Sequence, residues 1–454
     1  GADLVFVLLH GGMTASGYVA QMDNPGYYIT KDVAGIDGIV MGHEHNIFPD
    51  RGANPAYKFA GADNARGTVN GVPAVMASYW GKGLGVIRYT LQWDAAAKQW
   101  SVDRARTEVE VRSIESRDAA GRAAYVDSDP AVVAAVADLH EKTRAYVASP
   151  IGSSDFRLSS MFADVGNVGA LQIVNQAQQE YVANYVKTSL PQYANLPVLS
   201  VTAPFKAGYS SADDFTNVAA GTMTISAAAD LYLYDNNTIH AVKVTGAQIK
   251  QWLENAANRF NQIDPNKAED QWLINDSKTG VQPGASFPGY NFDVFTTADI
   301  SYEIDVTQPK YNVNDPAKGG ERIRNLRYKG QPMDSAQQFI VATNNYRANS
   351  SAPFILGTGK AFDIVWASPD ANREVVLNYV KAKKTITRAA NGSTSSWRFA
   401  KVATTGKVLF KSAPNALAVA QAAGLANISS DRADDTGVNG GNGSYGIYRI
   451  ALDQ

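Results

Sequence analysis

The chain has 454 residues, which predicts two or three domains rather than one core. Lys and Arg number 41 and Asp and Glu 43, so the net charge of -2 provides no basic field for duplex nucleic acid or an anionic membrane, and any nucleotide ligand should be small. The absence of Cys excludes thiolate metal sites, cysteine nucleophiles and disulfides, and no apolar run is long enough to predict a transmembrane helix.

The first part of the chain predicts a β-sheet. Short apolar or β-branched runs at residues 3–9, 36–41, 73–77 and 84–92 are separated by loops rich in Gly, Asn, Asp and Pro. The first run begins almost at the first residue, although a buried strand needs neighbours that earlier sequence would supply. We therefore expect that further residues precede Gly1 in the natural protein.

A change of composition follows this sheet. The polar stretch 113–122 predicts a linker, and the Ala- and Val-rich stretch 129–149, which opens with Asp-Pro, predicts a helix that bridges two domains. Helical periodicity at 166–189 and 246–260 then alternates with strand-like runs at 240–245, 300–306, 323–328 and 339–343. The second domain should therefore mix α and β elements, with a surface loop at 434–444.

Three of the five His lie in the first tenth of the chain, at His10, His43 and His45. His10 follows an apolar run and precedes two Gly, so it should lie at the carboxyl end of a buried strand, where α/β sheets bind ligands. His43 and His45 follow a second strand and a Gly turn, and neutral imidazole is a common ligand of zinc and similar ions. A bare His-x-His pair is more often free of metal, but the additional strand-end His favours a metal site formed by these three residues.

The other two His carry no such expectation. Asp138 and His140 spell Asp-x-His, but two residues at this spacing on a helix point about 200° apart, so His140 should face solvent. His240 precedes a strand without a cluster of partners, which indicates a structural role.

These residues resemble a known family. The sequences Leu-His-Gly at 9–11 and Gly-His-Glu-His at 42–45 are similar to the last two motifs of calcineurin-like metallophosphoesterases. The phrases at 35–49, 71–76 and 79–85 resemble the 2′,3′-cyclic-nucleotide 2′-phosphodiesterase/3′-nucleotidase branch of the 5′-nucleotidase family, and those at 159–175, 203–208, 290–294, 304–309 and 342–348 resemble the nucleotidase C-terminal domain of that branch. The Asp-x-His, bridging-Asp and Gly-Asn-His-[Asp/Glu] motifs of the family are absent from this chain.

The resemblance implies an α/β and α+β protein of two domains. Residues 1–115 would be the C-terminal portion of a metallophosphoesterase sandwich, 116–149 a linker and bridging helix, and 150–454 a mixed α+β nucleotidase C-terminal domain that binds the substrate. Related enzymes close their domains by rotation about the connecting helix, for which residues 129–149 are the candidate. The family also implies a periplasmic or secreted location.

The implied reaction is the metal-dependent hydrolysis of 2′,3′-cyclic nucleotides to 3′-nucleotides, and of 3′-nucleotides to nucleoside and phosphate. In the family, two divalent ions (zinc, manganese or cobalt) polarise the phosphate and supply an activated water. By position, His10 and His43 would bind one ion and His45 the other, while the remaining ligands and the catalytic His belong to the absent motifs. We therefore expect an incomplete site: the chain alone should bind metal weakly and not turn over, and a missing N-terminal segment of the same protein should complete it.

The resemblance also implies a base-binding site in the second domain. Its substrate-binding residues would be Lys206, Tyr290, Asn291, Phe292, Asn345 and Tyr346, with Asn344 nearby. Tyr290 and Tyr346 would stack on the two faces of a base, with Phe292 as a substitute for Tyr290. Lys206 takes the place of an Arg near the phosphate in related 5′-nucleotidases, and the Asn residues would bond base or ribose edges. With 22 Tyr and 16 Phe in the chain, however, most aromatic rings should belong to the core or the surface.

Other interpretations stay open. Residues 347–354 depart from the Gly-rich pattern expected after the second Tyr, which leaves the base preference and the 3′ or 5′ assignment undecided. A 5′-nucleotidase or UDP-sugar hydrolase on the same scaffold would be separated by its substrate profile. A non-catalytic nucleoside-binding protein would be excluded by finding the absent motifs upstream.

Overall fold

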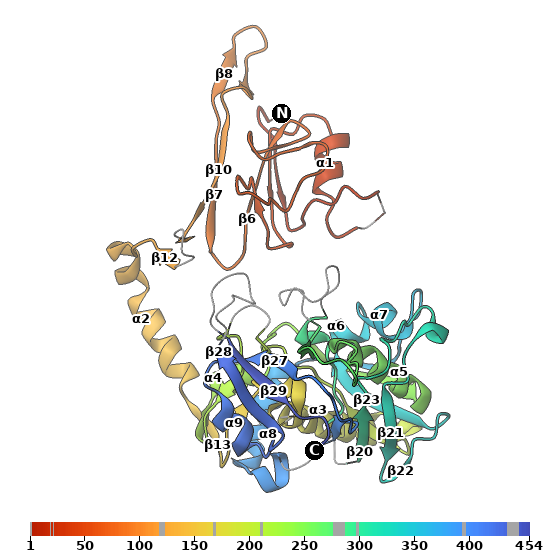
Figure 1. Ribbon diagram of the computed structural model, residues 1–454. Coiled ribbons are helices and arrows are strands. Elements are labelled where there is room, and N and C mark those ends of the chain that lie inside the picture. Colours follow the sequence, from red (N-terminus) through yellow and green to blue (C-terminus); the bar gives the residue numbers. More distant parts are fainter. Residues whose placement is uncertain are drawn as a thin grey trace. The chain divides into compact units, whose positions relative to one another are not determined.

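The computed structural model describes residues 2–18, 20, 22–117, 123–166, 169–208, 212–275, 287–296, 299–392, 396–433 and 445–454. The chain divides by its internal contacts into two compact units, unit 1 (Gly1–Ala135) and unit 2 (Val136–Gln454). Figure 1 labels several helices and strands of each unit. The segment 434–444, for which the sequence predicts a surface loop, lies outside the described residues.

Unit 1 is built on a six-stranded sheet in the order β1-β2-β6-β5-β4, with β3 paired to β6. Its strands are β1 (Phe6–Leu9), β2 (Gly38–Met41), β3 (Ile47–Phe48), β4 (Ala62–Asp63), β5 (Thr68–Val69) and β6 (Val72–Ala77). β1, β2 and β6 run parallel, so the loops that follow β1 and β2 leave the sheet at the same end. The strands predicted at 3–9, 36–41 and 73–77 are confirmed, with β1 shorter than expected.

One face of this sheet packs against a hydrophobic core, and the other face is partly exposed. Ile39 and Met41 of β2 are buried in a core to which residues of α1 (Gly26–Asp32) contribute. Val40, which alternates with them, points to the other face and is 43% exposed, and its neighbour Leu8 on β1 is 83% exposed. Part of one face of a parallel sheet is therefore apolar and exposed.

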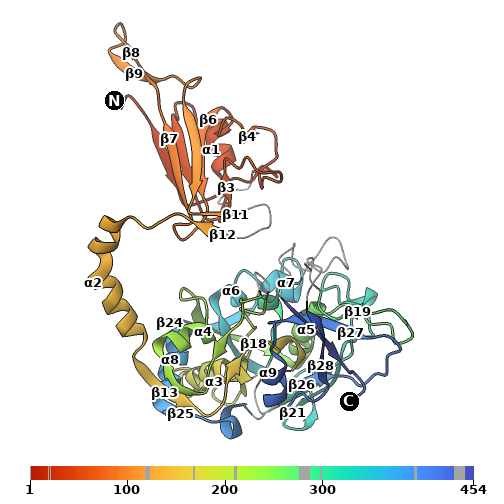
Figure 2. The same ribbon diagram turned by 60° about the vertical axis from the view of Figure 1, so that its left-hand side comes forward.

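A long antiparallel ribbon adjoins the sheet. β7 (Gly83–Arg88) pairs with β10 (Glu108–Ser113), and a Cβ on Gly85 would lie 2.7 Å from a methyl carbon of Val75, so only Gly allows this close approach to β6. Beyond the ribbon, β8 (Leu91–Asp94) and β9 (Gln99–Val102) form a hairpin (Figure 2). The run predicted as one strand at 84–92 is thus divided between β7 and β8.

Part of the predicted linker forms a strand, and the predicted bridging segment forms a helix. β11 (Glu115–Arg117) pairs with β12 (Ala123–Tyr125) within and just after the stretch predicted as a linker. α2 (Pro130–Val147) confirms the helix expected at 129–149, and it has no buried residue along its described length. His140 is exposed on α2, as expected from its spacing. Among the helices of the described ranges, none is both long enough and apolar enough to cross a bilayer.

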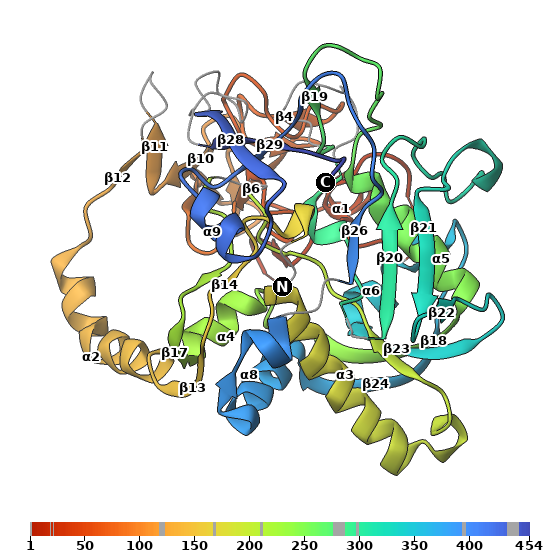
Figure 3. The ribbon, with the colours of Figure 1, turned by 60° about the horizontal axis from the view of Figure 1, so that its bottom comes forward.

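The centre of unit 2 is a four-stranded sheet in the order β15-β23-β18-β24. Its strands are β15 (Val198–Ser200), β18 (Thr238–Thr245), β23 (Gln338–Asn344) and β24 (Asp363–Ala371). On one face Ala241 belongs to a core shared with α3 (Gly169–Ser189) and α8 (Asn372–Lys383), which lie side by side (Figure 3). On the other face Val242 belongs to a core shared with α5 (Gly246–Ala256). His240, which the sequence predicts to precede a strand, lies within the first half of β18 and is buried.

Smaller sheets complete unit 2, in the orders β22-β21-β20-β26, β19-β27-β29-β28, β17-β13-β25 and β14-β16. Their strands are β13 (Pro150–Ser154), β14 (Leu158–Ser159), β16 (Asn217–Val218), β17 (Gly221–Thr224), β19 (Gln271–Trp272), β20 (Ile300–Ile304), β21 (Ile323–Tyr328), β22 (Gln331–Pro332), β25 (Thr385–Ile386), β26 (Trp397–Phe399), β27 (Val408–Ser412), β28 (Ile428–Ala433) and β29 (Gly446–Ile450). The short helices are α4 (Ile225–Leu231), α6 (Asn345–Ala348), α7 (Ala352–Leu356) and α9 (Leu417–Ala422). Unit 2 therefore mixes α and β elements, as predicted.

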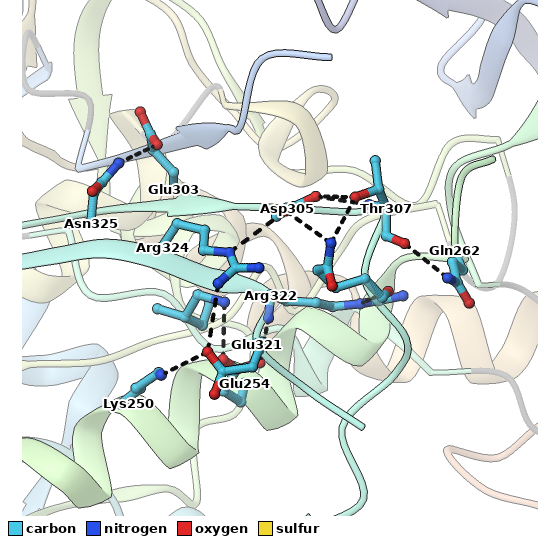
Figure 4. Close-up of polar contacts among 12 residues, drawn as sticks. Lys250, Glu254, Gln262, Glu303, Asp305, Thr307, Glu321, Arg322, Arg324 and Asn325 are labelled. Atoms are coloured by element: carbon cyan, nitrogen blue, oxygen red, sulfur yellow. Dashed lines mark hydrogen bonds and ion pairs between the residues drawn. The ribbon is translucent and has the colours of Figure 1, made fainter. Parts of the chain in front are cut away.

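Buried charges attach β21 to α5 (Figure 4). The carboxylate of Glu254, on α5, accepts hydrogen bonds from the main-chain nitrogens of Arg322 and Ile323, each of 3.0 Å. The guanidinium of Arg322 is fully buried and donates to the carbonyl oxygens of Ala257 and Phe260 at 2.7 and 2.8 Å. These bonds satisfy polar groups that would otherwise be costly to bury.

Candidate functional site

Unit 2 contains a cavity of about 370 Å³, which we call the aromatic cavity. It is lined by Phe205, Tyr234, Asn236, Asn237, Tyr290, Asn344, Tyr346 and Arg347. Both tyrosines that the sequence predicts as a base clamp therefore line one cavity, although they lie 56 positions apart in the chain. A larger open hollow of about 970 Å³, along α3 and α8, holds none of the predicted site residues.

The two tyrosines reach the cavity from different elements. Tyr290 lies in the single turn of 3-10 helix Gly289–Asn291. Tyr346 lies on α6, directly after β23, and its side chain is 53% exposed. The cap residue Asn344 accepts a 2.7 Å hydrogen bond from the main-chain nitrogen of Arg347, so the strand passes into the helix through a well-formed cap. The end of β23 thus determines the position of Tyr346 at the aromatic cavity.

A third wall comes from the loop after α4. The ring of Phe205 meets the rings of Tyr232 and Tyr234 edge to face, with centroids 4.9 and 5.2 Å apart. The hydroxyl of the buried Tyr232 accepts hydrogen bonds from the side-chain amides of Asn237 and Asn344, at 3.2 and 3.1 Å. Burial raises the pKa of both Tyr232 and Tyr234, so both phenols remain neutral near neutral pH. The wall is aromatic, with amide groups at its edge.

Phe292 lies elsewhere, and its predicted role as a substitute for Tyr290 needs correction. Only 1% of the residue is exposed, and its ring packs edge to face against Phe260 and Trp397, with centroids 5.2 and 5.5 Å apart. The ring is part of the hydrophobic core of unit 2 and does not line the aromatic cavity. Its apolar neighbours Val294 and Phe295 already indicate a buried segment in the sequence.

The remaining predicted contacts do not line the cavity. Asn291 accepts a long hydrogen bond of 3.4 Å from Arg347, and Asn345 accepts one of 3.1 Å from the main-chain nitrogen of Thr238. The ammonium of Lys206 forms an ion pair with Asp230, which compensates its charge. The neighbour of Lys206, Phe205, lines the cavity instead.

Sequence reasoning missed a buried ion pair next to this cavity. Nε of Arg347 lies 2.9 Å from a carboxylate oxygen of Asp293, and both side chains are 4% exposed. The same oxygen accepts a 2.7 Å hydrogen bond from Nε1 of Trp252. Burial raises the pKa of Asp293, and the ion pair and this hydrogen bond oppose that rise. The signal in the sequence was a lone Asp among apolar residues, which requires a partner when it is buried.

In unit 1, two of the three predicted metal ligands lie together. The rings of His10 and His43 meet edge to face with centroids 5.4 Å apart, and the loops that carry them are joined by a 3.2 Å hydrogen bond from Gly42 to Gly11. The ring of His45 stacks on Tyr79, with centroids 4.6 Å apart. All three His are exposed.

The carboxylate of Glu44 supports this arrangement. It accepts hydrogen bonds from the main-chain nitrogen of Met13 at 2.8 Å and from the hydroxyl of Tyr57 at 2.7 Å. A Cβ on Gly12 would lie only 1.7 Å from one of its oxygens. Gly12 therefore lets the loop after β1 pass close against Glu44, which holds the loops of His10 and His43 together.

These residues fit only part of a metal centre. Side-by-side imidazoles at the ends of parallel strands provide suitable nitrogen donors. Across the ranges that the structure describes, however, no group of three or more His, Cys, Asp or Glu side chains is placed to hold a metal ion. A centre of two ions needs further ligands.

The chain is similar to several known proteins. A family profile of the 5′-nucleotidase C-terminal domain matches residues 150–356. The chain is 40% identical over 409 residues to the 2′,3′-cyclic-nucleotide 2′-phosphodiesterase/3′-nucleotidase of Yersinia enterocolitica, covering 88% of this chain and 58% of the relative. It is 37% identical over 467 residues to the Salmonella typhimurium protein of the same name, covering 100% of this chain and 67% of the relative.

Two further similarities concern other members. The chain is 36% identical over 464 residues to the trifunctional nucleotide phosphoesterase protein YfkN of Bacillus subtilis, covering 100% of this chain and 28% of that protein. A crystal structure of a putative 5′-nucleotidase from Staphylococcus aureus shares the fold, with a TM-score of 0.51 and 18% identity over 89% of this chain and 64% of that one. The chain thus spans between 28% and 67% of the length of these three relatives.

Proposed function

This chain belongs to the family of 2′,3′-cyclic-nucleotide 2′-phosphodiesterases/3′-nucleotidases and contains its nucleotidase C-terminal domain, and from this premise we propose that it is part of a nucleotide phosphoester hydrolase. The reaction would convert 2′,3′-cyclic nucleotides to 3′-nucleotides, and these to nucleoside and phosphate. Unit 2 would bind the nucleoside base. The observation that carries the proposal is the cavity lined by both Tyr290 and Tyr346.

The chemistry of the cavity suits a flat, neutral ligand. Tyr290 and Tyr346 can offer the two ring faces that sandwich a base, and Phe205 and Tyr234 add two more aromatic rings to the lining. Each stacked base contributes roughly 1–3 kcal/mol in nucleic-acid complexes. The one charged residue of its lining, Arg347, is neutralised by Asp293 at 2.9 Å. A nucleobase fits this lining better than a phosphate, and the amides of Asn236 and Asn237 are suited to bond its edge.

For the catalytic part, we infer that His10, His43 and His45 supply imidazole ligands to a two-ion centre that a longer protein completes. Zinc, manganese or cobalt would suit such ligands, and would contribute positive charge and an activated water when bound. Two observations support a longer protein. The chain spans 58% and 67% of two relatives, and the apolar face at Leu8 and Val40 is of the kind that parallel sheets bury.

Other aspects rest on the family alone. A periplasmic or secreted location is one of them, and rotation about α2 is another. A 5′-nucleotidase or UDP-sugar hydrolase activity would use the same scaffold, and the fold shared with the putative 5′-nucleotidase of Staphylococcus aureus does not separate these activities. A substrate profile separates them directly.

The test compares this chain with the longer natural protein in an assay of 2′,3′-cyclic AMP hydrolysis with added manganese. The longer protein should hydrolyse 2′,3′-cyclic AMP and 3′-AMP in preference to 5′-AMP and UDP-glucose. Its His43→Ala variant should lose activity and metal, while this chain alone should stay inactive. A preference for 5′-AMP, or full activity of the His43→Ala variant, would contradict the proposal.

A further inference from the structure

A single side chain connects the two tyrosine-bearing segments of the aromatic cavity. Nη2 of Arg347 donates a 2.6 Å hydrogen bond to the carbonyl oxygen of Tyr290. Nη1 donates to Oγ of Ser351 at 3.2 Å and to the side-chain oxygen of Asn291 at 3.4 Å. With the ion pair to Asp293, the guanidinium has partners within residues 290–293 and at Ser351, which directly precedes α7.

The position of Arg347 in the sequence allows its side chain to control the spacing of the two tyrosines. Arg347 directly follows Tyr346 on α6, while the residue it holds, Tyr290, belongs to the facing turn. The main-chain nitrogen of Arg347 is fixed in turn by Asn344, whose amide donates to the hydroxyl of Tyr232. The same hydroxyl accepts from Asn237, so the third wall joins the same network.

We propose that Arg347 is a positioning residue that sets the separation of Tyr290 and Tyr346, with the buried Asp293 as its anchor. The proposal rests on the proposed function, in which these rings hold a base. Lys would not replace Arg here, since a single ammonium cannot reach a carboxylate, a carbonyl, a hydroxyl and an amide that surround a planar fork. Arg347 lines the cavity, but Nε, Nη1 and Nη2 of its guanidinium all bond protein groups, so it acts through the rings and not on the ligand.

A double-mutant cycle on this chain tests that distinction, with adenosine as the probe and calorimetry as the measurement. Arg347→Lys should weaken adenosine binding about tenfold, because a small displacement of the rings loses stacking. In a Tyr346→Ala background the same change should alter affinity less than about twofold, since the stack is already gone. A loss that is undiminished in that background would show a direct contact with the ligand and would overturn the proposal.

The matched control is Arg322→Lys, which alters another buried Arg that donates to main-chain carbonyl oxygens in unit 2. Amide hydrogen exchange provides a readout that needs no ligand. Residues 287–293 should exchange faster in Arg347→Lys and not in Arg322→Lys, and unchanged exchange in a folded Arg347→Lys protein would overturn the proposal. If that exchange changes but the unmodified chain binds no adenosine, the proposed function fails and the positioning role stands.

A milder variant keeps the proposal testable if Arg347→Lys does not fold. Ser351→Ala removes one acceptor of the guanidinium without touching the lining of the cavity. It should weaken adenosine binding by about twofold to threefold and accelerate exchange at 287–293 to a smaller extent. Binding and exchange identical to those of the unmodified chain would count against Arg347 as a positioning residue.

Discussion

The carbonyl oxygen of Tyr290 lies 2.6 Å from Nη2 of Arg347, the residue that follows Tyr346. The segments that carry the two aromatic residues proposed to hold a base are therefore joined through Arg347, and both residues line the same cavity. Their separation depends on a buried side chain and not on two independent loops. Preorganisation of this kind reduces the entropy lost on binding.

Tyr346→Ala should weaken nucleoside binding with little effect on folding. Loss of one stacking face should cost roughly 1–3 kcal/mol of binding free energy. The side chain is 53% exposed, so its removal creates no core cavity. Calorimetry with adenosine and thermal unfolding measure the two effects, and Tyr146→Ala is the control, since Tyr146 on α2 is 65% exposed. Unchanged adenosine affinity in Tyr346→Ala would contradict the clamp.

Arg347→Met should destabilise unit 2, because it leaves the carboxyl of Asp293 buried without its cation. Removal of one partner from a buried pair typically costs about 3–5 kcal/mol. The pKa of Asp293, already raised by burial, should rise further. A carboxyl whose pKa is higher in the folded than in the unfolded state contributes to the stability of the fold. This contribution is fully present below the unfolded-state pKa and is lost as the pH rises through the folded-state pKa.

The stability deficit of Arg347→Met should therefore be smaller near pH 5 than near pH 8. Urea unfolding at both pH values measures it. Arg398→Met is the control, since Arg398 pairs with Glu303 at the surface with 68% of its side chain exposed and should cost less than about 1 kcal/mol at either pH. A deficit independent of pH would show that Asp293 stays charged in the variant.

Gly12→Ala should destabilise unit 1. Its Cβ would lie 1.7 Å from a carboxylate oxygen of Glu44, which must then move and release its hydrogen bonds to Met13 and Tyr57. Two such bonds to a charged group contribute about 1.5–3 kcal/mol each. Chemical unfolding followed by the signals of unit 1 measures the change, and stability equal to that of the unmodified chain would show that Glu44 has alternative partners.

The lowered pKa of Lys310 predicts that the stability of unit 2 depends on pH. Burial, with a smaller contribution from Arg322, lowers its pKa to about 8. An amine with a lowered folded-state pKa contributes stability that is fully present above its unfolded pKa of about 10.4 and is lost as the pH falls through the folded pKa. The unfolding free energy of the chain, minus that of Lys310→Gln, should rise between about pH 8 and pH 10. A flat difference would contradict the lowered pKa.

Much of the fold follows from local sequence patterns. The parallel strands β1, β2 and β6 and the helix α2 are readable because apolar runs and a Pro at the helix start are local signals. The division of the predicted strand at 84–92 into β7 and β8 is not readable, since β-branched and aromatic residues continue through the bend. The pairing of β11 with β12 was hidden because β11 consists of the polar residues Glu-Ser-Arg and β12 is only three residues long.

The candidate site was likewise predicted only in part. Tyr290 and Tyr346 were predicted from resemblance, whereas their common cavity depends on tertiary contacts between distant segments. Phe292 was misplaced because its family resemblance was given more weight than its apolar neighbours Val294 and Phe295, which indicate a buried segment. The pair of Arg347 and Asp293 was missed because a lone Asp among apolar residues indicates that a partner is needed but does not identify the partner, which lies 54 residues further along the chain.

The most direct test of the proposed function is the binding of adenosine to this chain, measured by calorimetry without added metal. The account predicts saturable binding of one adenosine per chain, weakened by Tyr346→Ala and by Tyr290→Ala and unaffected by His43→Ala. Binding that is absent, or that His43→Ala abolishes while Tyr346→Ala leaves it intact, would contradict the assignment of base recognition to the aromatic cavity.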